Sequence, residues 1–251
     1  MLVMGILNVT PDSFADGGRH NDLEAAVARG LEMIAEGVDI IDIGGESTRP
    51  GADRVSEVEE IARTIPVITE LAKHGVRISI DTMRASTAEA AIRAGASIIN
   101  DVSGGLADSE MLQTVARLQV PYIAMHWRGQ SKDMNSKAIY GDVVSDVISE
   151  LNERIEAALD AGIQKDKLII DPGLGFAKDA EHNWAIIDSI DRFVALGYPV
   201  LVGGSRKRFL GGETPDEREQ ATIELTKRLG TTGVWAVRVH SVKPHKEVLS
   251  A

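Results

Sequence analysis

Hydrophobic residues along the chain fall into two alternating patterns. Short apolar runs rich in Val and Ile follow glycines at Gly37, Gly75, Gly95, Gly197 and Gly233. A glycine can end a helix because it accepts the left-handed backbone conformation, and near-continuous apolar runs are typical of parallel strands covered on both faces. The pattern therefore predicts strands at 38–43, 76–80, 96–99, 198–202 and 234–237, each preceded by a helix.

The stretches between these runs have the spacing of amphipathic helices. Leu23, Val27, Leu31 and Ile34 recur on one helical face, as do the apolar residues from Val144 to Leu159. Strands and helices should therefore alternate along the chain.

Local signals refine the helix predictions. Ser56 and Ser86 each precede a glutamate by three residues, which is the spacing of a capping box at a helix start. Pro66 removes an interior hydrogen bond, so it should kink the helix over 58–71 or divide it. Pro244 should break the short last helix in the same way.

Three further runs, at 1–7, 122–125 and 168–170, bring the predicted strands to eight. Eight βα units within 251 residues close a barrel more naturally than they form an open sheet. We therefore predict an α/β fold, a single (β/α)8 TIM barrel domain over residues 1–251. An open, Rossmann-type doubly wound sheet is the alternative.

The composition narrows the class of partner. The formal charge is −11 and the basic residues are scattered, so no nucleic acid partner is expected. The chain has no cysteine, which excludes thiolate chemistry and is typical of a reducing compartment such as the cytoplasm. The segment Met1 to Leu7 is short and lacks a basic flank, so we expect neither a signal peptide nor a membrane partner.

Polar or charged residues follow all eight predicted strands, where the loops of a TIM barrel build the active face. They are Asn8, Glu46 to Arg49, Asp81, Asn100 with Asp101, His126, Asp171, Ser205 to Lys207, and Arg238 with His240. Two acids and an amide from different strands suit the edge of a flat, nitrogen-rich heterocycle. Glycines and cations beyond strands seven and eight suit a phosphate group.

Each of these residues also has an ordinary structural explanation. Asp81 and Asp171 could be helix caps or turn residues, and the Asn100-Asp101 pair could form only an Asx turn. The basic loop after strand seven could simply be solvated. We assign no chemistry to His126, because a histidine at a strand end is as often a supporting group as a catalyst. Convergence on one barrel mouth favours the functional interpretation.

Two long loops rich in glycine and proline, at 8–18 and 44–52, lie at the same predicted face. We expect them to be mobile and to close over a substrate.

Seven segments of the chain resemble the dihydropteroate synthase family. They are 8–18, 44–52, Ser79 to Thr82, Ile99 to Gly105, Asp171 to Phe176, Ser205 to Lys207 and Arg238 to His240. The resemblance runs in order across nearly the whole chain. It implies a transferase of folate biosynthesis, a family targeted by sulfonamides. The implied reaction condenses 6-hydroxymethyl-7,8-dihydropterin diphosphate with p-aminobenzoate, giving 7,8-dihydropteroate and pyrophosphate.

The resemblance also implies roles for individual residues. The pterin would bind Asp81, Asn100, Val102, Met125, Asp171, Phe176, Gly203 and Lys207. p-Aminobenzoate would contact Phe14, Thr48, Arg49, Pro50 and Ser205. The diphosphate would bind Asn8, Arg238 and His240, with Asn8 as a ligand of Mg²⁺. The catalytic set would be Asp81, Asp16, Lys207, Arg238 and His240. A cytoplasmic homodimer with small-molecule substrates is implied as well.

The chemistry of the implied reaction fits these residue types. Loss of diphosphate from a pterin methylene should pass through a cation-like, SN1-type transition state, because the electron-rich ring delocalises positive charge. Arg238, His240 and Mg²⁺ would stabilise the departing anion, and Asp81 with Asp16 would stabilise the cation. No protein nucleophile is required.

The chain departs from the family pattern at two positions. Ser241 stands where an aspartate is usual, and Gly204 where another small residue is commoner. We expect the first change to loosen the end of strand eight.

Three competing functions can be weighed against the motifs. A methyltetrahydrofolate-corrinoid methyltransferase would not need Arg238, His240 or the Ser205-Lys207 pair. A catalytically silent pterin-binding paralogue would not be expected to keep its loop residues intact. A generic phosphate-binding isomerase barrel would not need the loop at 8–18.

Overall fold

The computed structural model describes residues 1–10, 18–46, 55–130, 132 and 134–250, and it confirms the predicted barrel. Within these residues, parallel strands form one eight-stranded sheet in the order β6-β5-β4-β3-β2-β1-β8-β7. The strands are β1 (Leu2–Asn8), β2 (Ile40–Gly44), β3 (Arg77–Asp81), β4 (Ile98–Asp101), β5 (Tyr122–Met125), β6 (Leu168–Asp171), β7 (Leu201–Val202) and β8 (Ala236–Val239). A parallel bridge between Ile170 and Val200 brings the two ends of the sheet together.

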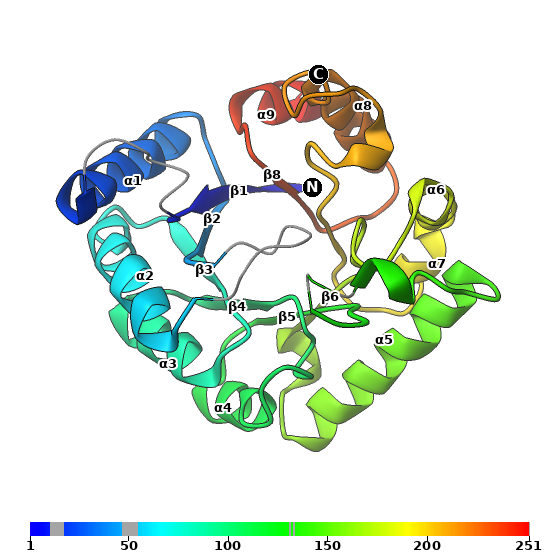
Figure 1. The fold of residues 1–251 in the computed structure, drawn as a ribbon, viewed down its shortest axis with the longest axis horizontal. Helices are drawn as coiled ribbons and strands as arrows, with labels where there is room; N and C mark the ends of the chain where they lie inside the picture. The colour runs from blue at the N-terminus through cyan, green and yellow to red at the C-terminus, as the bar shows by residue number, and fades with distance from the viewer. Residues whose placement is uncertain (11–17, 47–54, 131, 133, 251) are drawn as a thin grey trace.

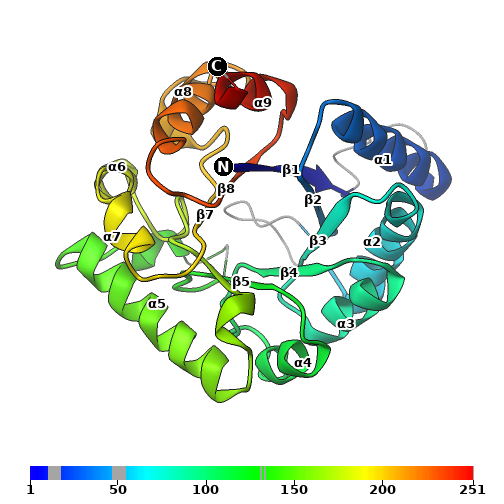
Figure 2. The same ribbon diagram turned by 180° about the vertical axis from the view of Figure 1, so that it is seen from behind.

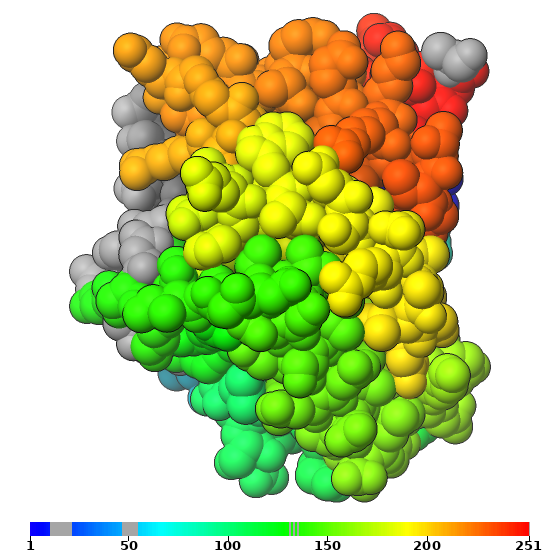
Figure 3. All heavy atoms as spheres, turned by 90° about the vertical axis from the view of Figure 1, so that its right-hand side faces the viewer, coloured from blue at the N-terminus to red at the C-terminus, as the bar shows by residue number. Residues whose placement is uncertain are grey.

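The helices of the described chain form a ring around these strands (Figure 1, Figure 2). They are α1 (Gly18–Ala35), α2 (Glu57–Ala72), α3 (Ala85–Ala94), α4 (Met111–Leu118), α5 (Val143–Asp160), α6 (Ala180–Asp188), α7 (Ile190–Val194), α8 (Glu219–Leu229) and α9 (Lys243–Ser250). Short 3-10 turns lie at η2 (Met134–Lys137), η3 (Lys165–Lys167) and η4 (Arg208–Leu210). Figure 3 shows one side of this ring, where the α6 and α7 region lies between α5 and α8.

The glycines that ended the predicted helices have the expected backbone conformation. Gly95 caps α3 with φ +116°, and its N–H donates to the carbonyls of Ala91 and Ile92. Gly37, whose φ is +84°, follows α1 in the same way. These glycines therefore end their helices, as the hydrophobic pattern predicted.

An apolar layer fills the inside of the barrel near the amino ends of the strands. It consists of Met4, Ile40, Ile98, Ile123, Ile169, Leu201 and Ala236, with Leu2 and Trp235 packed against it. We call these residues the apolar floor. Successive side chains of a strand point to opposite faces, so the residue two positions beyond each floor residue also points inward. The floor therefore fixes which side chains line the barrel mouth.

Several local predictions were wrong. β7 covers only Leu201–Val202, because Pro199 has no N–H to donate to the sheet. α3 starts at Ala85, so Ser86 lies inside the helix and does not cap it. Pro244 does not break α9, since it lies in the first turn, where its missing N–H is not needed.

Other local predictions hold. Ser56 caps α2, with its Oγ accepting a hydrogen bond from the N–H of Glu59 at 3.2 Å. The helix then continues through Pro66 as one element, so it is not divided there. In the described parts of the chain, no helix combines the length and apolar character that a membrane crossing requires.

Candidate active site

A polar layer lies directly above the apolar floor. Two residues beyond their floor residues, the strands carry Asp42 on β2, Asn100 on β4, Asp171 on β6 and Arg238 on β8. Asp81 ends β3 and is paired in register with Asn100. The strand alternation therefore brings to one level residues that are up to 196 positions apart in the chain.

Arg238 joins three strands within this layer. Its Nε lies 2.6 Å from Oδ2 of Asp42, and its Nη2 lies 2.7 Å from Oδ2 of Asp81. Two carboxylates therefore share one guanidinium. Removal of Arg238 would leave two buried carboxylates without their shared cation, which is strongly unfavourable.

Asp42 is the residue of this layer that our sequence analysis missed. It is fully buried, and its Oδ2 also accepts a hydrogen bond from Nδ2 of Asn100 at 3.1 Å. Its Oδ1 has no hydrogen-bond partner among the described residues. Asp42 was hidden inside a run that we interpreted only as a buried strand. Counting two positions on from Ile40 would have placed it on the inner face.

Asn100 and Asp101 have separate tasks. Asp101 forms the predicted Asx turn, with its carboxylate accepting hydrogen bonds from the N–H of Ser103 at 2.8 Å and of Gly105 at 2.7 Å. It also accepts a hydrogen bond from the Tyr122 hydroxyl at 2.8 Å. Because Asp101 makes the turn, Asn100 is left to face the barrel interior, as the site prediction requires.

Asp171 combines a turn with a place in the polar layer. Its Oδ1 accepts the N–H of Gly173 at 2.7 Å, whereas its Oδ2 lies toward Gly203. Lys207, from the loop after β7, donates to the carbonyl of Leu174 in the loop after β6. Residues from both loops thus meet beside Asp171.

An apolar wall completes this side of the barrel mouth. Met83, Val102 and Met125 form a buried cluster, against which Phe176 packs. The Nζ atom of Lys207 lies 4.7 Å from the centre of the Phe176 ring. A flat ring could be held here between apolar side chains and hydrogen-bonding groups, which is the usual composition of a small-molecule site.

Ser205 and His240 form a second group beside Arg238. The backbone N–H of His240 donates to Oγ of Ser205 at 3.2 Å, and the Ser205 hydroxyl lies 2.9 Å from Nδ1 of His240. In the tautomer in which the hydroxyl donates to Nδ1, the hydrogen of the neutral imidazole is on Nε2, which then has the donor character that an anion site needs. The structure thus places Ser205, predicted to contact p-aminobenzoate, against a residue of the predicted diphosphate site.

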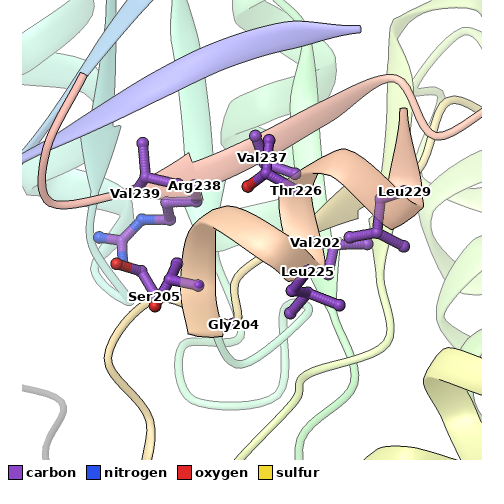
Figure 4. Close-up of a pocket in the computed structure, with 10 residues that line it drawn as sticks. Val202, Gly204, Ser205, Leu225, Thr226, Leu229, Val237, Arg238 and Val239 are labelled. Atoms are coloured by element: carbon purple, nitrogen blue, oxygen red, sulfur yellow. The ribbon is translucent and has the colours of Figure 1, made fainter. Parts of the chain in front are cut away.

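Figure 4 shows a small gap behind these groups, between α8 and strands β7 and β8. It is lined by Leu225, Leu229 and Val202 on its apolar side. It is far too small for a substrate ring, so we interpret this gap as a packing defect behind the site.

The two departures from the family pattern are accommodated locally. Ser241 does not loosen the end of β8, because its hydroxyl donates to Glu219 and accepts from Arg206 Nη2 at 3.2 Å. A Cβ on Gly204 would come within 2.6 Å of Leu225 Cδ2, so a larger residue here would require the Leu225 side chain of α8 to shift.

Burial shifts the ionisation of this site toward neutral pH. Burial raises the pKa of Asp81, and the Asp42 carboxylate adds to the shift, although Arg238 opposes it. Burial also raises the pKa of Asp171. The pKa of Lys207 is lowered to about 8 by burial, with the Asp171 carboxylate opposing the shift. Ligand binding here should therefore depend on pH.

Asn8 ends β1 at the barrel mouth and is half-buried. Its side chain has no hydrogen bond to any other residue that the structure describes. The described residues also contain no group of three or more His, Cys, Asp or Glu that could hold a metal ion. Mg²⁺ often has few protein ligands and relies on water and substrate phosphates, so one amide oxygen is compatible with it.

Several residues named in the sequence analysis fall outside the described ranges. These are Phe14, Asp16, Thr48, Arg49 and Pro50. Their predicted roles remain predictions.

Comparison with known proteins gives consistent matches over the whole chain. A model of the pterin binding enzymes matches residues 4–240. The dihydropteroate synthase of Mycobacterium leprae is 47% identical, over 98% of this chain and 90% of that protein. A structure of Xanthomonas albilineans dihydropteroate synthase with 4-aminobenzoic acid superposes with a TM-score of 0.93, at 44% identity, covering 99% of this chain and 90% of that one. A structure from the same organism in complex with 7,8-dihydropteroate has a TM-score of 0.90 at 41% identity, covering 99% and 91%.

Proposed function

The chain belongs to the dihydropteroate synthases of the pterin-binding enzyme family, and on that premise we propose how its residues carry out the reaction. The enzyme is a transferase that joins 6-hydroxymethyl-7,8-dihydropterin diphosphate to p-aminobenzoate. Its products are 7,8-dihydropteroate and pyrophosphate. The observation that carries the proposal is the polar layer on the apolar floor, with Ser205 and His240 beside it.

The pterin ring is proposed to bind in the polar layer. The Asp171 carboxylate can accept two N–H groups of the ring, which is a charge-assisted contact. Asn100 offers an amide with both donor and acceptor atoms, and Lys207 can donate to a ring carbonyl. Met125, Val102 and Phe176 supply the apolar wall, and Gly203 leaves room beside Asp171.

The leaving diphosphate is proposed to face Arg238 and His240. The guanidinium is a permanent cation, and the imidazole, held at Nδ1 by Ser205, is a second donor in the tautomer that carries its hydrogen on Nε2. Donors fixed before the reaction are effective because they need no reorganisation as charge develops. Mg²⁺ held by Asn8 would neutralise part of the diphosphate charge when bound.

The cation-like transition state needs negative charge beneath the pterin methylene. Asp81 and Asp42 supply two carboxylates, paired through one guanidinium, at the level of the ring. Asp16 is proposed to help stabilise the cation, and Phe14, Thr48, Arg49, Pro50 and Ser205 to bind p-aminobenzoate. Its amine is the nucleophile, so no side chain has to form a covalent intermediate.

We also propose that the enzyme acts as a homodimer in the cytoplasm. The absence of cysteine from the sequence supports a reducing compartment. The dimer is supported by the family relationship and is tested by analytical ultracentrifugation.

The proposal is tested by mixing the protein with the dihydropterin diphosphate, p-aminobenzoate and Mg²⁺ and following pyrophosphate release. We expect rapid release that depends on p-aminobenzoate. Release of equal rate without p-aminobenzoate would mean hydrolysis, and no release would mean a silent paralogue. Methyl transfer from methyltetrahydrofolate to a corrinoid, assayed in parallel, should not occur.

A further inference from the structure

A buried lysine outside the proposed contacts holds the loop that forms the wall of the site. Lys178 lies at the end of the connection between β6 and α6 and is 8% exposed. Its Nζ lies 3.1 Å from the carbonyl oxygen of Gly173 and 3.0 Å from that of Phe176. The third neighbour is Nδ1 of His126, at 2.8 Å. An ammonium group has three N–H donors, so three acceptors satisfy it completely.

This arrangement fixes the tautomer of His126. Because Nδ1 accepts from Lys178, the hydrogen of the neutral ring is on Nε2, which lies 2.9 Å from Oε2 of Glu150. Burial, together with the Lys178 charge, lowers the pKa of His126 to about 4, although Glu150 opposes the shift, so the ring stays neutral. Arg128 Nε donates to the same Glu150 carboxylate at 3.0 Å. We call Lys178, His126, Glu150 and Arg128 the lysine cluster.

The loop held by this cluster has a demanding backbone. Gly173 has φ +70°, and a Cβ on it would come within 2.5 Å of the His126 carbonyl oxygen. Ala177 has φ +48°, a conformation that costs an L-residue about 1–2 kcal/mol. Such a conformation persists only where surrounding contacts enforce it. The hydrogen bonds from Lys178 to the carbonyls of Gly173 and Phe176 are contacts of this kind, since they hold both ends of the loop against one side chain.

The loop in turn carries part of the proposed pterin site. Phe176 packs on the apolar wall, and the carbonyl of Leu174 accepts the hydrogen bond from Lys207. Displacement of the loop would therefore move both the ring of Phe176 and the anchor of Lys207. Neither effect requires Lys178 to touch a substrate.

We propose that Lys178 is a positioning residue for pterin binding, whose ammonium group clamps the β6–α6 loop in its binding conformation and is oriented by His126 and Glu150. This inference rests on the proposed function. It assigns a purpose to the buried histidine that the strand-end pattern alone could not interpret.

The clamp depends on the charge of Lys178. The charged groups that face it are Asp171 on β6, Lys207 after β7, Arg128 after β5 and Glu150 on α5, together with the neutral His126. Burial lowers the pKa of Lys178 to about 7, although Asp171 opposes the shift. A neutral amine has only two N–H donors for three acceptors. The loop should therefore lose one anchor as the pH rises.

The first test replaces Lys178 by Met, which keeps the length of the side chain but removes its donors. Binding of 6-hydroxymethyl-7,8-dihydropterin without diphosphate is measured by calorimetry at about pH 6, where the lysine is charged. We expect Kd to rise about tenfold or more in Lys178→Met. The KM for p-aminobenzoate should change by less than about twofold, because the anchored loop carries Phe176 and the anchor of Lys207 and none of the residues proposed to bind p-aminobenzoate. Lys165→Met, in η3 before β6, is the matched control and should bind as the wild type does.

The second test uses Glu150→Gln, a milder change at a partly exposed side chain, in case Lys178→Met does not fold. Loss of the Glu150 charge should make Lys178 easier to deprotonate. The ratio of the Kd of the variant to that of the wild type should therefore be about threefold larger at about pH 8 than at about pH 6. A ratio that is the same at both pH values would overturn the proposal.

The two levels of the argument can fail separately. If the wild type neither binds the dihydropterin nor releases pyrophosphate, the proposed function fails. If the wild type does both, and a folded Lys178→Met binds the dihydropterin as tightly, only the positioning role fails.

Discussion

The Nε atom of Arg238 lies 2.6 Å from Oδ2 of Asp42, and this ion pair spans β1 by joining β8 to β2, its two neighbours in the sheet. Both residues lie in the polar layer, two positions beyond the floor residues of their strands. The pair therefore links the anion side of the site, beside Ser205 and His240, to the pterin side, where Asn100 donates to the same aspartate.

Asp42→Asn should impair the enzyme, although the family resemblance assigned no role to Asp42. The variant keeps the shape of the side chain but leaves Arg238 with one carboxylate where it had two. We expect kcat/KM to fall by about thirtyfold, or about 2 kcal/mol. Asp39→Asn, just before β2, is the control: its carboxylate pairs with Lys246 at 3.0 Å in a partly exposed position, and such pairs contribute little. Equal activities of the two variants would contradict the role of Asp42.

Lys207→Ala and Asp171→Asn should each cripple pterin binding. Both remove a group that we expect to contact the ring, so each should cost more than about 2 kcal/mol, roughly thirtyfold, in kcat/KM. Lys227→Ala on the exposed face of α8 is the control for loss of a lysine. Near-normal steady-state kinetics in both site variants would refute the assignment.

Pterin affinity should fall as the pH rises through about 8, because burial lowers the pKa of Lys207 to about that value and only the ammonium form donates fully. The unfolded chain keeps this lysine protonated up to its usual pKa of 10.5. Between about 8 and 10.5 the unfolded state therefore binds more protons, so the contribution of Lys207 to stability rises with pH while binding weakens. Calorimetric Kd values and urea unfolding over this range check both directions. Affinity that is constant from about pH 7 to 9 would contradict this account.

Gly173→Ala should destabilise the protein more than Gly75→Ala. The two glycines have nearly the same φ, +70° and +71°, so both substitutions introduce about 1 kcal/mol of backbone strain. Only at Gly173 would the new Cβ also meet a backbone oxygen, at 2.5 Å, whereas nothing lies within 4 Å at Gly75. The Tm of each variant, measured by thermal unfolding, checks this prediction. Equal shifts in Tm would show that the loop at Gly173 can move to accommodate the new Cβ.

The sequence predicted most of the fold because its signals are local. Helix ends at glycines such as Gly95, and apolar runs such as the one before Asp81, depend on neighbours in the chain. The errors arose where one residue changed a boundary. Pro199 shortened β7 by withholding an N–H, and Ala85 started its helix one residue before the serine that we expected to cap it.

The site was predicted in part, for a different reason. Residues at strand ends, such as Asp171 and Arg238, were found because the barrel topology points to them. Asp42 was missed because it lies within a strand, where an acid is hidden among apolar neighbours. Lys178 was missed because His126, the one side chain it binds, follows another strand, and the two nearby carbonyls it binds carry no side-chain signal.

A crystal structure of the protein with bound 6-hydroxymethyl-7,8-dihydropterin tests the central claim most directly. We predict that the ring lies above the apolar floor, with Asp171, Asn100 and Lys207 each within about 3 Å of a ring nitrogen or oxygen. A ring bound elsewhere on the barrel, with these three side chains out of contact, would contradict the account.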